Sequence, residues 1–172
     1  MGGKMRVGNK FFLIFLILFV LSISHCLIDE GIGQTSQYTE KELREIIRAN
    51  PNHAEAHYNL GILLQDLKRN EEAEKEYKEA NKINPNYADA HNNLGILLQH
   101  LRRYEEAEKE YKEAIKINPN HAEAHANLGL LYKDINKKDE ARREFLIARG
   151  LFEKQNRAEH VKTIDEWLNN LK

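Results

Sequence analysis

Two pairs of histidines have the spacing of a helical metal site. His53 and His57 are four residues apart, as are His121 and His125, and two imidazoles one turn apart on a helix can bind a transition metal. The first member of each pair, however, is expected to precede its helix, and no third ligand is evident. His57, His91 and His125 recur every 34 residues, so they fall on separate helices about 8–10 Å apart. We therefore expect no metal site and no cofactor.

The sequence contains no recognisable set of catalytic residues. Cys26 lies in an apolar segment near the N-terminus. Because it is the only cysteine, no intramolecular disulfide can form. No glycine-rich phosphate loop and no Ser/His/Asp motif is present. The Glu/Lys run 71–78 places Glu74 four residues before Lys78, which is the spacing of ion pairs on a solvated helix face. We expect that the chain is not an enzyme.

Charge also excludes a class of partner. The formal net charge is −1, and all basic residues before position 29 lie in the first ten, so residues 29–172 carry 23 basic and 27 acidic side chains. Nonspecific binding of nucleic acid requires clustered positive charge. We expect no nucleic-acid partner.

The elements that position these residues are set by an internal repeat. Segments 54–87 and 88–121 are identical at 27 of 34 positions, and segment 122–155 is a looser third copy. Self-similarity at such a period indicates one supersecondary unit stacked on copies of itself. The sequence therefore predicts three stacked units.

Each unit has the pattern of a helical hairpin. In repeat 1, Leu60 and Leu64 belong to one apolar helix face, and Ala73 and Tyr77 belong to a second. The second run ends at Asn84-Pro85-Asn86, because proline disfavours helical geometry at the residue before it. Two helices of about 14 residues form an antiparallel hairpin that cannot bury both apolar faces alone. Neighbouring hairpins must stack.

Glycine marks the closest approach of the two helices. Gly61, Gly95 and Gly129 stand in the middle of the first helices, where glycine costs about 1 kcal/mol relative to alanine. Ala73, Ala107 and Ala141 offer small residues on the second helices. We expect close helix packing at these positions.

This pattern resembles the tetratricopeptide repeat family. The resemblance covers about 100 residues and rests on the spacing His57-x-x-Leu60-Gly61-x-x-Leu64, Ala73-x-x-x-Tyr77, Ala80 and Pro85. Repeat 2 matches it, whereas repeat 3 has Glu153 in place of the proline, and histidine replaces the usual aromatic residue in all three copies. The resemblance implies an all-α fold: an α-solenoid of three antiparallel hairpins, with a preceding half-repeat helix and a C-terminal capping helix.

The resemblance also implies a peptide-binding groove lined by the first helices. Asn59, Asn93 and Asn127 form a ladder similar to the one with which O-linked N-acetylglucosamine transferase grips peptide backbone, since an amide offers both donors and an acceptor. The groove residues that the resemblance implies are Glu55, Tyr58, Asn59, Ile62, Asp89, Asn92, Asn93, Ile96, Glu123, Asn127, Leu130 and Lys133.

The groove composition favours one kind of partner. A chaperone-type carboxylate clamp would need lysine at positions 58 and 123, but Tyr58 and Glu123 stand there, and Glu123 would repel a carboxylate. Acidic residues at positions 55, 66, 89, 123 and 134 surround an apolar stripe of Ile62, Ile96 and Leu130. We expect a non-enzymatic scaffold that holds a basic and apolar protein segment, extended or helical.

The N-terminal residues have the pattern of a leader. Lys4, Arg6 and Lys10 precede the apolar run 11–21, which is typical of a secretory signal peptide. Ser22 and Ser24 supply the small residues at positions −3 and −1 of a cleavage site after Ser24. The alternative is an uncleaved anchor, since residues 11–28 make about 27 Å of helix, near the lower limit for spanning a bilayer. Both alternatives place the repeats outside the cytoplasm. Residues 1–28 are thus a signal peptide or signal anchor, and 29–38 a linker.

Both ends of the array carry an expected cap. Thr39 and Glu42 form a capping box for a helix within 39–53. Asn156 is expected to cap a last helix within 156–172, with Trp167 at the edge of its apolar stripe. These caps favour a monomer, although end-to-end self-association into an assembly module is the alternative function.

Overall fold

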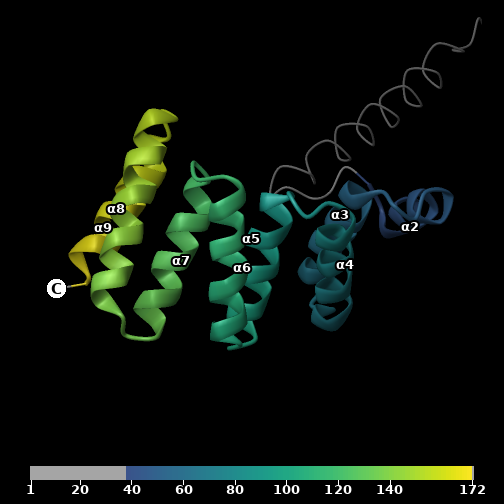
Figure 1. Cartoon of the computed structure of the whole chain (residues 1–172), viewed down its shortest axis with the longest axis horizontal. Coiled ribbons are helices and arrows are strands. Elements are labelled where there is room, and N and C mark those ends of the chain that lie inside the picture. Colours follow the sequence, from purple (N-terminus) through teal and green to yellow (C-terminus); the bar gives the residue numbers. More distant parts are fainter. Residues whose placement is uncertain (1–37, 172) are drawn as a thin grey trace, which may run out of the picture. The chain divides into compact units, whose positions relative to one another are not determined.

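The computed structural model describes residues 38–171, and in that range eight helices and no strand are found. Figure 1 shows them in chain order. They are α2 (Glu40–Ala49), α3 (Ala54–Asp66), α4 (Asn70–Ile83), α5 (Ala88–His100), α6 (Tyr104–Ile117), α7 (Ala122–Asp134), α8 (Lys138–Lys154) and α9 (Ala158–Asn169). The prediction of an all-α fold is confirmed.

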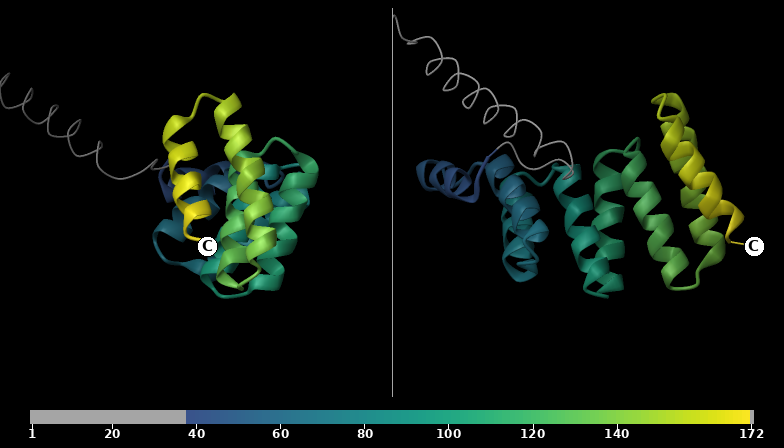
Figure 2. Two further views of the ribbon diagram at one scale, coloured as in Figure 1. Left: turned by 90° about the vertical axis from the view of Figure 1, so that its left-hand side faces the viewer. Right: turned by 180° about the vertical axis from the view of Figure 1, so that it is seen from behind.

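Consecutive helices pair into three hairpins. Helix α3 packs along α4, α5 along α6, and α7 along α8, while α4 and α6 each also contact the first helix of the following hairpin. Helix α2 packs on α3 as α4 packs on α5, and α9 packs on α8; the views in Figures 1 and 2 agree on this order. The hairpins, the half-repeat helix and the C-terminal helix are therefore present as predicted.

The turn inside each hairpin repeats the same backbone geometry. Lys68, Arg102 and Asn136 have φ near 60°, and in the first hairpin the Arg69 N–H donates to the Leu64 carbonyl over 2.9 Å. A left-handed residue followed by this bond closes the last turn of a helix in a Schellman motif. The motif reverses the chain within three residues and sets the two helices side by side.

Proline determines where the second helices end. Helices α4 and α6 each have 14 residues and end two positions before Pro85 and Pro119. Helix α8 has 17 residues, so the expected length of about 14 is wrong for repeat 3, because no proline stops it. The predicted cap at Asn156 is also wrong: Asn156 has φ 57°, and the N-cap of α9 is Arg157, which makes no side-chain cap bond.

The capping box predicted for α2 is confirmed. The Thr39 hydroxyl accepts from the Glu42 N–H over 3.3 Å, and the Thr39 N–H donates to the Glu42 carboxylate over 2.8 Å. These two bonds satisfy donors that a helix start otherwise leaves unpaired.

In the core of each hairpin, an aromatic side chain of the second helix packs directly on a glycine of the first helix. A Cβ placed on Gly95 would lie 2.7 Å from Cδ1 and Cε1 of Tyr111, and Gly61 and Gly129 stand in the same relation to Tyr77 and Phe145. Close helix approach at the three glycines is therefore confirmed, although aromatic rings rather than the alanines make the nearest contact. The Tyr111 hydroxyl donates to Gln99 over 2.9 Å, so the buried ring is fixed at its far end.

Ion pairs connect successive second helices. Arg69 lies 2.8 Å from Glu40, Arg103 lies 2.7 Å from Glu74, and Lys137 lies 3.9 Å from Glu108. The arginine side chains are about one-third exposed, so solvent screens each pair and its contribution to stability is small. The pairs tie each repeat to the next along one edge.

The predicted leader, residues 1–28, and most of the linker lie outside the described residues. Between residues 38 and 171, no helix combines the length and the apolar character needed to cross a bilayer.

Candidate functional site

A chain of amide hydrogen bonds crosses the first helices. Asn127 donates to Asn92 over 3.0 Å, Asn92 donates to Asn93 over 3.2 Å, and Asn93 donates to the Tyr58 hydroxyl over 3.1 Å. These residues come from α7, α5 and α3, and neighbouring members of that series contact one another. Asn93 and Asn127, two of the three asparagines of the predicted ladder, are thus joined through Asn92, whereas Asn59 is not part of this chain of bonds.

The bonding leaves specific atoms available to a ligand. Asn92 is only 6% exposed and uses both its amide oxygen and its nitrogen within the chain of bonds, so it holds its neighbours in place. The Asn127 oxygen and the whole Asn59 amide make no hydrogen bond within residues 38–171. A side-chain amide can offer two donors and an acceptor, so Asn59 and Asn127 keep capacity for a peptide unit.

A cavity of about 320 Å³ opens beside these amides, between α5, α7 and the C-terminal part of the chain. Ile96 and Ala126 form one side of it, and Phe152, Ile164 and Trp167 the other. The Trp167 ring lies 5.4 Å from the Phe145 ring, centroid to centroid, which holds it in position. The complete lining is Asn92, Asn93, Ile96, Glu123, Ala126, Asn127, Phe152, His160, Thr163, Ile164 and Trp167.

A buried histidine and an arginine meet at Glu123, at the edge of this cavity. His121, the N-cap of α7, is 7% exposed, with Nε2 3.2 Å from Asp89 and Nδ1 3.3 Å from Glu123. Arg157, the N-cap of α9, donates to the Glu123 carboxylate. Burial lowers the pKa of His121, but the carboxylates of Asp89 and Glu123 raise it more, to about 9.

These contacts change the expected charge of the groove. The contacts with His121 and Arg157 outweigh burial and lower the pKa of Glu123 to about 2, and the nearby imidazole of His121 also lowers the pKa of Asp89. Both carboxylates are therefore ionised but already paired. Asp89 and Glu123, two of the acidic residues expected around the apolar stripe, thus have partners within the chain. Arg157 reaches Glu123, and His121 reaches Asp89, only when the helices stack.

The remaining predicted groove residues occupy two kinds of environment. The Tyr58 ring lies 4.9 Å from the Tyr87 ring, centroid to centroid, with the two planes tilted by 44°. Burial raises the pKa of Tyr58 to about 12. Ile62, Ile96 and Leu130 are half-buried against the core. Glu55 and Lys133 are exposed, and neither forms an ion pair with a described residue.

The histidines that could have suggested a metal site have other partners. The Nδ1 atoms of His57, His91 and His125 lie 2.6, 2.7 and 2.7 Å from glutamates of the paired second helix, and no cluster of three metal-ligating side chains occurs between residues 38 and 171. The glutamates are Glu76, Glu110 and Glu144. Each histidine therefore joins the two helices of its own hairpin.

Sequence reasoning missed the wall that α9 contributes. Trp167 is expected at the edge of an apolar stripe, yet together with Ile164 it also lines the cavity. The sequence does indicate this wall, because α9 follows the third hairpin at the position where the first helix of a further repeat would line the groove.

Stacked helical hairpins with a polar and apolar recess across their first helices define a repeat scaffold of the protein-interaction class. Family models described as "Tetratricopeptide repeat" match residues 88–121 and residues 42–75 and 110–143, and one described as "TPR repeat" matches 66–101, so that together they cover 42–143. The chain belongs to the tetratricopeptide repeat family, whose members are in general non-catalytic interaction modules.

Solved structures agree with this assignment. A structure of MamA matches with a TM-score of 0.62 and 27% identity over 68% of this chain and 64% of that one, which is slightly less than two thirds of the MamA chain. The TPR2B domain of yeast Sti1, in a complex with pHsp70, matches with a TM-score of 0.66 and 22% identity over 69% of this chain and 94% of that one. No curated protein sequence matches the chain.

Proposed function

We propose that this chain is a scaffold that holds an extended or helical segment of another protein along α3, α5 and α7. The cavity beside Trp167 is the observation that carries the proposal, since it is mostly apolar and large enough for one bulky side chain of the partner. The Sti1 domain, which shares the fold, binds a protein partner. The amide of Asn127, which lines the cavity, would fix the partner's backbone next to that side chain, and the amide of Asn59 would do so farther along the groove, on α3.

Charge supports a basic residue in the partner, at the α3 end of the groove. Glu55 and Asp66 make no ion pair with a described residue, whereas Asp89 and Glu123 are paired with His121 and Arg157. The partner that fits is therefore a segment with an apolar anchor near α9 and a positive charge near α3. The sequence alone predicted only that the partner segment is basic and apolar; this proposal adds where along the groove each of the two features would bind.

We also propose that the repeats act outside the cytoplasm, after export by the leader or while anchored by it. The basic residues before the apolar run 11–21 support this placement. Mass spectrometry of the protein from its own cells would give the mature N-terminus. A chain beginning after Ser24 indicates export with cleavage, an intact leader in the membrane fraction indicates anchoring, and an intact leader in the cytosol rejects the proposal.

Crosslinking and affinity purification test the groove. The variant Asn59→Ala/Asn93→Ala/Asn127→Ala is compared with wild type and with a matched triple variant on the outer face of α6, Glu105→Ala/Lys109→Ala/Lys112→Ala. Partners bound in the groove are lost from the asparagine variant and kept by the α6 variant. Equal recovery of every partner by all three proteins rejects the groove.

Trp167, the only tryptophan in the chain, reports on the cavity directly. A partner peptide that fills it changes the fluorescence of Trp167 on titration. Replacing the peptide's apolar anchor by alanine should weaken binding by tenfold or more, because a buried large side chain contributes about 1.5–3 kcal/mol.

A further inference from the structure

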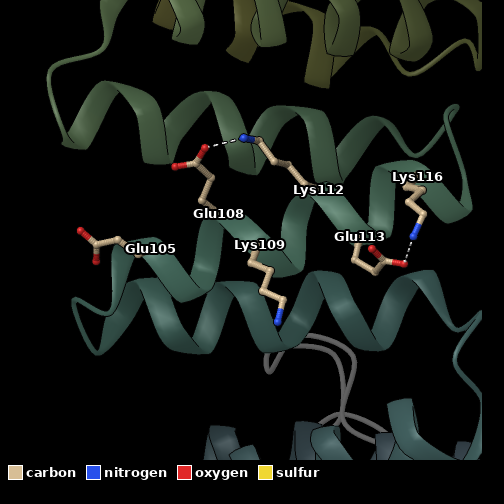
Figure 3. A pocket seen from close by; sticks show the side chains of 6 residues that line it. All are labelled: Glu105, Glu108, Lys109, Lys112, Glu113 and Lys116. Atoms are coloured by element: carbon tan, nitrogen blue, oxygen red, sulfur yellow. Dashed lines mark hydrogen bonds and ion pairs between the residues drawn. The ribbon is translucent and has the colours of Figure 1, made fainter.

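The outer faces of α4 and α6 neutralise their own charge. On α6, Glu108 lies 2.6 Å from Lys112 and Glu113 lies 2.8 Å from Lys116. Figure 3 shows these two pairs as dashed lines. The equivalent residues of α4 form the same pairs, Glu74 with Lys78 and Glu79 with Lys82. Glu74 and Glu108 also pair with Arg103 and Lys137 of the following repeat, so the carboxylates of these faces already have cationic partners within the described residues.

The outer face of α8 differs at every one of these positions. Counting 34 residues on from α6, Leu146 and Ile147 replace Lys112 and Glu113, and Gly150 replaces Lys116. Leu146 is 54% and Ile147 45% exposed, and a Cβ on Gly150 would meet no atom within 4 Å.

Two arginines extend this surface toward the start of α8. Arg142 and Arg143 replace Glu108 and Lys109; they are exposed and form no ion pair within residues 38–171. They precede Leu146 and Ile147 by four residues, and Gly150 follows Leu146 by four, so these positions share one side of the helix. We call Arg142, Arg143, Leu146, Ile147 and Gly150 the α8 strip.

The change is confined to the solvent side. Ala141, Phe145 and Ala148 of α8 are buried as Ala107, Tyr111 and Ala114 of α6 are, so packing requires the same inner face in both repeats. A single exposed leucine is ordinary. The α8 strip instead combines two adjacent apolar residues, two unpaired arginines and a helical glycine that costs about 1 kcal/mol relative to alanine.

We propose that the α8 strip is a second interaction surface, separate from the groove, that binds an acidic amphipathic helix of another protein. The apolar residues of that helix pack on Leu146 and Ile147, its backbone approaches closely at Gly150, and its carboxylates pair with Arg142 and Arg143. Charge complementarity selects this occupant, because the strip presents two unpaired cations beside its apolar residues.

Other occupants fit the strip less well. The strip spans nine residues, about 14 Å of helix, and Asp139 and Glu140 stand next to its arginines, where they would repel an anionic membrane. The outer faces of α4 and α6 in a second copy of this chain are charge-balanced and do not match the strip.

The matched variant takes its residues from the chain itself. Leu146→Lys/Ile147→Glu installs on α8 the two residues that α6 carries at the same positions, so the fold is expected to persist. The probe is a synthetic 18-residue amphipathic helix with leucines at i, i+3, i+4 and i+7 and glutamates beside them; a second peptide has lysines in place of the glutamates. Binding of labelled peptide to the full chain is measured by fluorescence anisotropy.

We expect the acidic peptide to bind wild type at least tenfold more tightly than Leu146→Lys/Ile147→Glu or Arg142→Glu/Arg143→Glu, and more weakly as salt is raised. The Asn59→Ala/Asn93→Ala/Asn127→Ala variant should bind it as wild type does, which separates this surface from the groove. The proposal is overturned if the two peptides bind equally, if neither binds at 1 mM, if only anionic vesicles are bound through the strip, or if sedimentation shows self-association that Leu146→Lys/Ile147→Glu abolishes.

Discussion

Substitution of Gly95 by alanine tests whether a tyrosine ring sets the spacing of the hairpin helices. The new Cβ would lie 2.7 Å from two atoms of the Tyr111 ring, well inside ordinary van der Waals contact. The ring is 1% exposed and bonded to Gln99, so it cannot turn aside without losing a hydrogen bond. Overpacking of this kind costs about 1–3 kcal/mol.

A second helical glycine provides the control. Gly150 lies inside α8, and a Cβ there meets nothing within 4 Å. Gly150→Ala should therefore stabilise the protein by about 0.5–1 kcal/mol through helix propensity alone. The same gain is present in Gly95→Ala, so the difference between the two variants isolates the steric cost, about 1–3 kcal/mol.

Urea unfolding followed by circular dichroism at 222 nm measures both changes. We expect Gly95→Ala to lower the midpoint or leave it unchanged, and Gly150→Ala to raise it, with similar slopes in all three proteins. In thermal unfolding each 1 kcal/mol corresponds to roughly 2–4 °C in a domain of this size. A difference below about 0.5 kcal/mol would refute the packing of Gly95 on Tyr111.

Three other perturbations have expected outcomes. The pKa of His121 is raised from 6.5 to about 9 in the folded protein. Its ion pairs therefore stabilise the fold fully below about pH 6.5, and this stabilisation is lost as the pH rises through 9. Urea unfolding measured from pH 6 to 10 should show a loss of unfolding free energy on the order of 1–3 kcal/mol, and the His121→Gln variant should not show that loss. Arg103→Met should lower the urea midpoint only slightly, and the effect should shrink in 1 M salt, because the pairs of Arg103 with Glu74 and Glu106 are partly exposed. A large loss that does not depend on salt would contradict this. Arg102→Gly should stabilise the chain by up to about 1 kcal/mol, since Arg102 has φ 59° and glycine adopts that conformation without strain, whereas Arg103→Gly, at φ −88°, should not.

Much of the fold could be predicted because the information is local and repeated. The positions of Gly95 and Tyr111 fix the contact between paired helices, and Pro85 and Pro119 fix where α4 and α6 end. The errors occurred where the repeat changes: α8 continues past the position at which proline is missing, and α9 begins at Ala158 after a left-handed Asn156. A pattern learned from two nearly identical copies does not specify a third that departs from it.

The sequence by itself determined the hairpin, its repetition and the faces that must be buried, because helix periodicity and turn residues act over a few positions along the chain. Only the tertiary structure decided that Arg157 and His121 neutralise Glu123, that Asn127, Asn92, Asn93 and Tyr58 are joined by hydrogen bonds, and that Trp167 closes a cavity beside them. Arg157 and Glu123 are 34 positions apart in the chain, and Asn127 and Asn92, like Asn93 and Tyr58, are 35 apart. Their distances therefore follow from how each hairpin stacks on the next. That stacking is set by the packing of all the side chains between them and not by any local pattern.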